Sequence, residues 1–174
     1  TPPKVVDLKV LYGSRTYSIL NSTRTLPFFN IRGIEVDFSE PVTMASSAVS
    51  LTGRNVPLYN PSLSVASDRA VLSLPSAIDI DRLLLTLDGQ SSFGVHDLVG
   101  NAMGSNLSKG FNVLPGDFNG DGVVTTTDLV GVGVLIGLPP TGSSVFADLD
   151  GDGAITLADY NLVKTRIGRK LPTA

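Results

Sequence analysis

Two segments in the C-terminal part of the chain place acidic side chains at the same spacing. "DFNGDGVVTTTD" covers residues 117–128 and "DLDGDGAITLAD" covers residues 148–159. Each has an acid or an amide at its first, third and fifth positions, a glycine at its sixth and an acid at its twelfth. All seven acids of residues 115–174 fall inside these segments, although the net charge of the chain is only −3. Such spacing indicates two loops that close around a cation.

Calcium is the cation that this pattern favours. It takes about six to eight oxygen ligands, and positions 1, 3, 5, 7, 9 and 12 of a loop of about 12 residues point toward it. Surface Asp-Gly turns would explain one copy, but not two copies with every acid at a ligand position. The sequence therefore predicts two calcium ions. Their ligands are Asp117, Asn119, Asp121, the Val123 carbonyl, Thr125 through water and Asp128 in the first loop, and Asp148, Asp150, Asp152, the Ala154 carbonyl, Thr156 and Asp159 in the second.

Each acidic loop is followed by a stretch with helical periodicity, which makes a repeat of 31 residues. We expect helices over 128–137 and 159–168, each ending at a glycine. The sixth-position glycines, Gly122 and Gly153, suit a sharp turn. One face of each helix is apolar, formed by Leu129, Val132 and Ile136 in the first and Tyr160, Val163 and Ile167 in the second. The residues at position 8, Val124 and Ile155, are expected to join the two loops by an apolar contact.

The first 113 residues are typical of an all-β fold. Short segments rich in Val, Leu, Ile and Phe are separated by turn-forming residues, with no helical period between them. In the clearest segment, Ile34, Val36 and Phe38 alternate with Glu35 and Asp37, so the apolar set is expected to face inward and the acids to face water. The pattern favours an antiparallel sandwich. Strands are expected at 4–13, 31–42, 47–53, 69–77, 81–89 and 109–116, and the part from 14 to 30 is expected to be a long loop with at most one strand.

Two departures from an EF-hand point to a particular family. Position 12 is Asp in both loops, one methylene shorter than the usual Glu, and the segment before each loop has no helical pattern. Residues 114–172 therefore resemble the type I dockerin, whose two loop–helix motifs bind calcium and dock onto cohesin domains. The resemblance implies that Leu114-Pro115 and Leu171-Pro172 clasp the two ends of the domain. It also implies a cohesin contact through positions 10 and 11 of the loops, which are Thr126, Thr127, Leu157 and Ala158.

The two copies are unequal, so one docking orientation is expected to dominate, and we favour the threonine pair. Gly131 and Gly133 lie inside the first predicted helix, where each glycine costs about 1 kcal/mol relative to alanine. Either a partner surface or the second helix approaches closely at these positions. The sequence leaves both explanations open.

The remainder of the chain, through "IEVDFSEPV", "LLLTLDG" and "GVHDLVGNAM", resembles the immunoglobulin-like repeats of bacterial surface and secreted proteins. Such repeats serve as spacers or adhesion modules. We therefore expect an immunoglobulin-like β-sandwich over residues 1–113 and a small α-helical dockerin, with two EF-hand-like calcium loop–helix motifs, over residues 114–174. The expected setting is extracellular or at the cell surface, as in a cellulosome-like assembly. The chain starts at Thr1, which suggests a processed protein or the C-terminal part of a larger one.

Several other functions find little support in the sequence. The small net charge argues against attraction to nucleic acid or to a membrane, and no apolar run reaches the roughly 18 to 20 residues that span a bilayer. Without cysteine there is no disulfide or thiol chemistry. His96 beside Asp97, and the pair Asp79 and Asp81, show no catalytic spacing, so we expect no enzyme activity.

Two alternatives stay open. The β-rich part is a carbohydrate-binding or adhesion module in one of them, which requires exposed aromatic side chains. In the other, the chain is the non-catalytic tail of a secreted polysaccharide-degrading enzyme, and it meets polysaccharide through that parent protein. The aromatic residues that would support carbohydrate binding, the first alternative, are Tyr12, Tyr17, Phe28, Phe29 and Tyr59.

Overall fold

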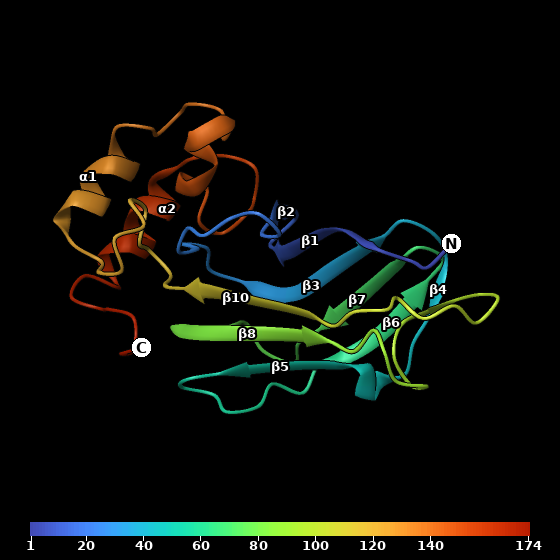
Figure 1. Ribbon diagram of the computed structural model, residues 1–174. Helices are drawn as coiled ribbons and strands as arrows, with labels where there is room; N and C mark the ends of the chain where they lie inside the picture. The colour runs from blue at the N-terminus through green and yellow to red at the C-terminus, as the bar shows by residue number, and fades with distance from the viewer.

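The structure is a computed structural model that describes residues 1–174, and it is built mostly of antiparallel β-sheet. We call residues 1–113 the β region and residues 114–174 the loop–helix region. All strands lie in the β region, while the two α-helices lie near the C-terminus (Figure 1). The expectation of antiparallel β-structure followed by a small helical part is confirmed at this level. None of the helices has the length and apolar character needed to cross a membrane.

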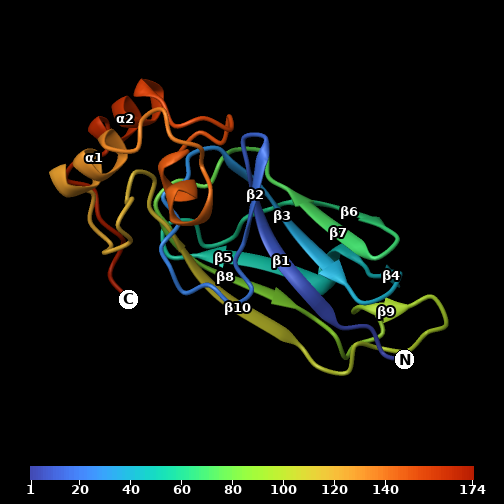
Figure 2. The ribbon, with the colours of Figure 1, turned by 90° about the horizontal axis from the view of Figure 1, so that it is seen from above.

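The β region contains a five-stranded, a three-stranded and a two-stranded sheet, with every strand pair antiparallel. The orders are β2-β1-β3-β7-β6, β10-β8-β5 and β4-β9. Figures 1 and 2 show the five-stranded sheet lying over the three-stranded one, and the buried side chains of both form one core. The strands are β1 (Val5–Tyr12), β2 (Arg15–Ser18), β3 (Ile31–Phe38), β4 (Val42–Thr43), β5 (Val49–Gly53), β6 (Ser62–Ala66), β7 (Arg69–Ser73), β8 (Asp81–Leu87), β9 (His96–Asp97) and β10 (Leu107–Val113), with a short 3-10 helix η1 (Ser46–Ala48) before β5.

The alternation predicted for β3 is present, but its acids are not simply solvated. Ile34, Val36 and Phe38 are buried in the core. On the opposite face Glu35 Oε1 lies 3.1 Å from Lys9 Nζ of β1, and Asp37 is bound by Lys9 and by Arg69 of β7. Cross-strand ion pairs of this kind stabilise the pairing of neighbouring strands.

Of the two edge strands of the large sheet, the sequence patterns missed β6 and allowed β2 only as a single strand within a long loop. β2 lies within the part expected to be mainly loop, and β6 lies in a serine-rich stretch with no strand expected. Every second residue of each is exposed. An edge strand pairs on one side only and buries little apolar surface, so its sequence carries a weak strand signal.

Both α-helices begin and end earlier than expected. α1 spans Thr126–Gly133 and α2 spans Leu157–Lys164, two residues ahead of the predicted starts. The N-caps are Thr125 and Thr156, whose hydroxyls accept backbone N–H groups of the first turn. The predicted apolar faces are correspondingly shorter, because Ile136 and Ile167 lie beyond the helix ends and are exposed.

The loop–helix region has its own small core, which also includes the 3-10 helix η2 (Gly142–Ala147). The two halves are tied to each other by their backbones. Gly168 N–H donates to Val124 C=O at 2.8 Å, and Gly137 N–H donates to Ile155 C=O at 2.9 Å. Each loop is therefore anchored to the end of the other repeat. The buried members of this core are Leu114, Val124, Val132, Ala147, Leu149, Ile155 and Val163.

Close packing inside the loop–helix region explains the two glycines of α1. A Cβ on Gly131 would lie 2.5 Å from the ring of Phe118, and a Cβ on Gly133 would lie 3.2 Å from the ring of Tyr160 on α2. The first distance is below any normal contact and the second is tight. The second helix therefore accounts for Gly133, whereas Gly131 is explained by Phe118, which neither explanation had named.

An aromatic cluster lies where the two regions meet. Tyr12 stacks on Phe28 with 3.8 Å between ring centroids, and Phe146 of η2 packs against Tyr17 and Phe28. The guanidinium of Arg24 lies 3.8 Å from the Phe146 ring centroid. The two regions therefore share an apolar contact in addition to the chain that connects them.

Asp81 is a buried organiser that the sequence did not distinguish from its neighbour Asp79. Its carboxylate accepts the N–H groups of Arg54, Asn55 and Val56 and the hydroxyl of Tyr59. Asp79 is largely exposed and pairs only with Arg166, at 3.0 Å. The two acids are thus not a matched pair on one strand face.

We expect Asp81→Ala to lower the free energy of unfolding by about 3 kcal/mol or more, because several buried donors would lose their acceptor. Chemical denaturation followed by circular dichroism measures the change. Asp79→Ala is the matched control and should cost under about 1 kcal/mol, since its ion pair is exposed. Equal losses in the two variants would contradict this account of the 54–59 loop.

Candidate metal centre

The first acid of each acidic loop is fully buried and gathers the backbone around itself. We call residues 117–128 loop one and residues 148–159 loop two. The Asp117 carboxylate accepts the N–H groups of Gly120, Asp121 and Gly122 at 2.9 to 3.1 Å. In loop two, Asp148 accepts those of Gly151 and Gly153 at 3.0 and 3.1 Å. The glycines have positive φ values, which turn their N–H groups inward.

The twelfth residue of each loop closes it. One oxygen of Asp128 accepts the Asn119 N–H at 3.0 Å, and the other accepts the Thr125 N–H at 2.7 Å. In loop two, Asp159 accepts the Thr156 N–H at 2.9 Å in the same way. Its other oxygen accepts the Leu149 N–H, one loop position earlier, at 2.7 Å and the Asp150 N–H at 3.4 Å. These contacts complete the capping boxes of α1 and α2. The shorter Asp thus joins the start of the loop, its end and the first turn of its helix.

Three acids of loop two are grouped as a metal site requires. Ligand oxygens of Asp148, Asp150 and Asp152 lie within 4.8 Å of one another. Oxygens that share one calcium ion at about 2.3 to 2.6 Å can be no more than about 5 Å apart. In loop one the third position is Asn119, whose side chain contacts Asp121 at 2.8 Å. This donor set of carboxylate, amide and carbonyl oxygens fits a hard dication.

Burial makes three acids of these loops harder to ionise. It raises the pKa of Asp117 to about 6, against an ordinary value near 4, although the Gly122 and Gly120 N–H groups oppose the rise. Burial also raises the pKa of Asp148, where Arg15 opposes it, and that of Asp150. A bound dication would favour the charged form of all three side chains.

The four side chains expected to contact a partner are all exposed. Thr126 and Thr127 lie in the first turn of α1, and Leu157 and Ala158 in the first turn of α2. Val130 and Val134, further along α1 and just past its end, are exposed by 62% and 71%. The start of each helix therefore offers an uncovered surface beside its loop.

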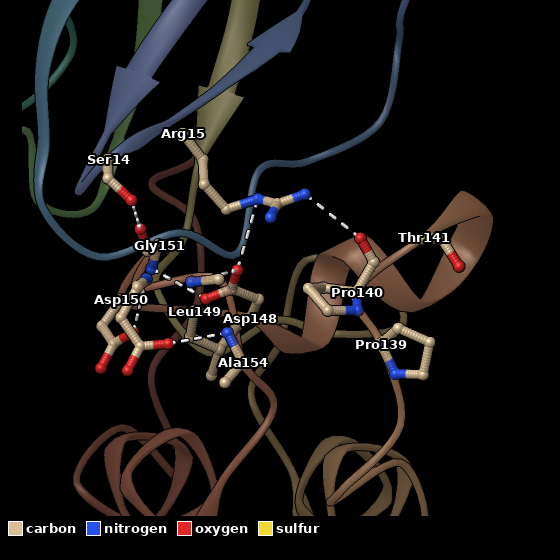
Figure 3. A network of polar contacts seen from close by, with 12 residues as sticks. Ser14, Arg15, Pro139, Pro140, Thr141, Asp148, Leu149, Asp150, Gly151 and Ala154 are labelled. Atoms are coloured by element: carbon tan, nitrogen blue, oxygen red, sulfur yellow. Dashed lines mark hydrogen bonds and ion pairs between the residues drawn. The ribbon is translucent and has the colours of Figure 1, made fainter.

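The β region contributes side chains to this centre that the sequence patterns did not indicate. Arg15 Nε lies 3.4 Å from Asp148 Oδ2, and Ser14 bonds the Gly151 carbonyl of loop two (Figure 3). Arg24 bonds the Phe118 carbonyl of loop one. These residues lie 94 to 137 positions before the loop residues that they contact, so only the fold brings them together.

The geometry defines a duplicated loop–helix domain in which each half gathers acids around a turn. Residues 115–168 match the family model of the dockerin type I domain, so this part of the chain is similar to a type I dockerin. No curated protein matches the chain. A dockerin domain implies calcium binding and calcium-dependent docking to a cohesin domain. Calcium, when bound, supplies positive charge beside the buried acids of both loops.

We expect the calcium-free chain to be more stable at pH 5 than at pH 7.5. Asp117 has a folded pKa of about 6, above its unfolded value near 4. Its contribution to stability is therefore fully present below about pH 4 and is lost as the pH rises through about 6. The melting temperature in chelator, followed by circular dichroism at 222 nm, should fall by several degrees over this range.

The variant Asp117→Asn should reduce this pH dependence, because it removes the acid whose pKa is raised to about 6, while Asp148 and Asp150 remain. The acids with lowered pKa values, Asp37, Asp88 and Asp97, titrate below this pH window and leave the sign unchanged. A calcium-free melting temperature that rises from pH 5 to pH 7.5 would contradict the prediction.

Proposed function

We propose that this chain is a calcium-dependent docking unit, in which the dockerin binds a cohesin and the β region is its spacer. The observation that carries the proposal is the duplicated loop with ligands at positions 1, 3, 5, 7, 9 and 12, in a segment that matches the dockerin family. Two calcium ions per chain are proposed, one in each loop. A region of about 60 residues gains much of its stability from such ions, because they bind the folded state only.

The docking face is proposed to centre on Thr126 and Thr127. Both are exposed at the start of α1, where neither side chain has a metal to coordinate. The exposed Val130 and Val134 add apolar surface beside them, which suits the core of a protein interface. On α2, Leu157 and Ala158 are followed by Lys164, so the second half has a different chemistry. The proposed interface therefore uses the first half.

The β region is proposed to be an immunoglobulin-like sandwich without catalytic activity, in a secreted bacterial protein. Its division from the dockerin near residue 113 is supported by the two separate cores. His96 Nδ1 lies 3.0 Å from the Gly94 carbonyl, while Asp97 accepts bonds from Val99 and Asn101. These two neighbours thus serve local turns. A spacer has no need of a catalytic group.

The five aromatic candidates for carbohydrate binding have little accessible surface in this fold. Tyr12 and Phe28 are fully buried, and Tyr17, Phe29 and Tyr59 are only partly accessible. Tyr59 also donates its hydroxyl to Asp81. A sugar-binding platform needs exposed aromatic faces, which these five residues do not supply. The spacer function is therefore the better supported, and a secreted polysaccharide-degrading enzyme remains a candidate for the parent protein.

We expect the chain to capture a cohesin domain in calcium and to release it in chelator. Thr126→Glu combined with Thr127→Glu should weaken this binding at least tenfold, because charges would be buried at the contact. Surface plasmon resonance against a panel of cohesins measures the affinity, and calorimetry checks that calcium uptake is retained. Glutamate is tolerated at a helix N-terminus, so the fold should persist.

The matched control is Leu157→Glu combined with Ala158→Glu, at the equivalent positions of α2. Loss of binding in this control alone would reverse the proposed orientation. Failure of every cohesin to bind the calcium-loaded chain, together with calorimetry that detects no calcium uptake, would sink the proposed function.

A further inference from the structure

The turn between β1 and β2 rests on the backbone of loop two. The N–H group and the hydroxyl of Ser14 each lie 2.9 Å from the Gly151 carbonyl. A second tie follows nearby, where the Phe29 N–H donates to the Leu149 carbonyl at 2.8 Å. Figure 3 shows Ser14 and Arg15 reaching from the β region toward loop two. Three hydrogen bonds from the β region therefore hold the second and fourth positions of this loop.

The two backbones approach too closely for any side chain between them. A Cβ on Gly13 would lie 2.3 Å from the Asp150 carbonyl oxygen, and a Cβ on Gly151 would lie 2.3 Å from the Tyr12 carbonyl oxygen. Both obstacles are backbone atoms, which cannot swing away as a side chain can. The β1–β2 turn and loop two are thus shaped to fit each other.

Arg15 adds a charged contact to the first ligand of the loop. Its Nε lies 3.4 Å from Asp148 Oδ2, the same oxygen that accepts the Gly153 N–H. Its Nη2 donates to the Pro140 carbonyl at 3.2 Å, which fixes the guanidinium in place. Groups that hold a metal ligand from outside orient it and tune its affinity.

Loop one lacks the backbone contact. Gly120 occupies the same loop position as Gly151 and has a similar φ value, +80° against +74°. A Cβ on Gly120 would meet only the flexible side chain of Arg24, at 3.4 Å. Gly120 is also partly accessible, whereas Gly151 is buried. The two loops therefore differ in what surrounds them more than in their own sequences.

We propose that the β1–β2 turn, residues 12–15, is a structural part of the second calcium site. It holds loop two in its ion-binding shape, with Ser14 and Arg15 as positioning residues. Ordering a loop in advance lowers the cost of binding. By linkage, calcium in loop two must strengthen the contact between the regions by the same factor. The inference rests on the proposed function in assuming that loop two binds calcium.

The test compares Gly151→Ala with Gly120→Ala in the full chain. Both place an alanine at the same loop position and in the same left-handed conformation, so the strain within the loop is matched. Only Gly151→Ala also pushes against the β region. Calcium titrations followed by NMR report each site separately, through the Gly122 amide for loop one and the Gly153 amide for loop two.

We expect Gly151→Ala to weaken calcium binding at loop two at least tenfold more than Gly120→Ala weakens it at loop one. Ser14→Ala, which alters the β region alone, should weaken loop two about two- to threefold and leave loop one unchanged. If Gly151→Ala fails to fold, the calcium affinity of loop two in Ser14→Ala tests the proposal instead. Equal losses in the two alanine variants, or no effect of Ser14→Ala, would overturn the proposal.

The reciprocal effect is measured by hydrogen exchange. Chelating calcium should speed exchange of the Ser14 and Phe29 amides at least tenfold. The amides of β8 and β10 that bond the two strands to each other should keep their protection. Unchanged exchange at Ser14 and Phe29 in a chain that releases its calcium would overturn the coupling but not the proposed function. If the unmodified chain takes up no calcium at all, both proposals fail.

Discussion

The loop–helix region depends on two carboxylates that are buried at the start of their loops. Asp117 and Asp148 have no accessible surface, yet each collects the N–H groups of its own loop. A buried charge is costly unless it is paired, and neighbouring acids add repulsion. A bound cation would offset both costs, and Arg15 already offsets part of the cost at Asp148. Around this constraint the closing acids Asp128 and Asp159 set where the helices start, and the small apolar core fills the space between the halves.

The sequence predicted the features that lie within one continuous segment, and it did not predict the contacts between residues that are far apart in the chain. Each acidic loop is a continuous segment of twelve residues, so its spacing predicted the candidate ligands. The family match agrees with the dockerin resemblance. The alternation in β3 was equally local. The edge strand β6 and the contacts of Arg15 left no pattern, because the first buries little and the second joins residues far apart in the chain. The sequence could not distinguish Asp81 from Asp79, because only the fold shows that Asp81 is buried.

The two repeats are nearly symmetric inside and unequal outside. Their loops are cross-tied through Gly137 and Gly168 in the same way, and their capping boxes match. The difference comes from the β region, which meets loop two with its backbone and loop one mainly with the side chain of Arg24. Duplicated motifs that become inequivalent through their surroundings can divide labour, with one half stabilised from within the chain and the other left to face a partner.

The junction between the two regions also determines how the molecule bears a load. The chain crosses the junction once as a continuous polypeptide beside Val113, but further ties lie apart from this crossing, among them Ser14 to Gly151 and Arg82 to the Pro172 carbonyl. A single strand of polypeptide would act as a swivel, whereas ties on several sides resist bending. The helices lie at the end of the molecule opposite the N-terminus (Figure 1). A partner held on α1 is therefore kept at a fixed reach and direction from the far end of the β region.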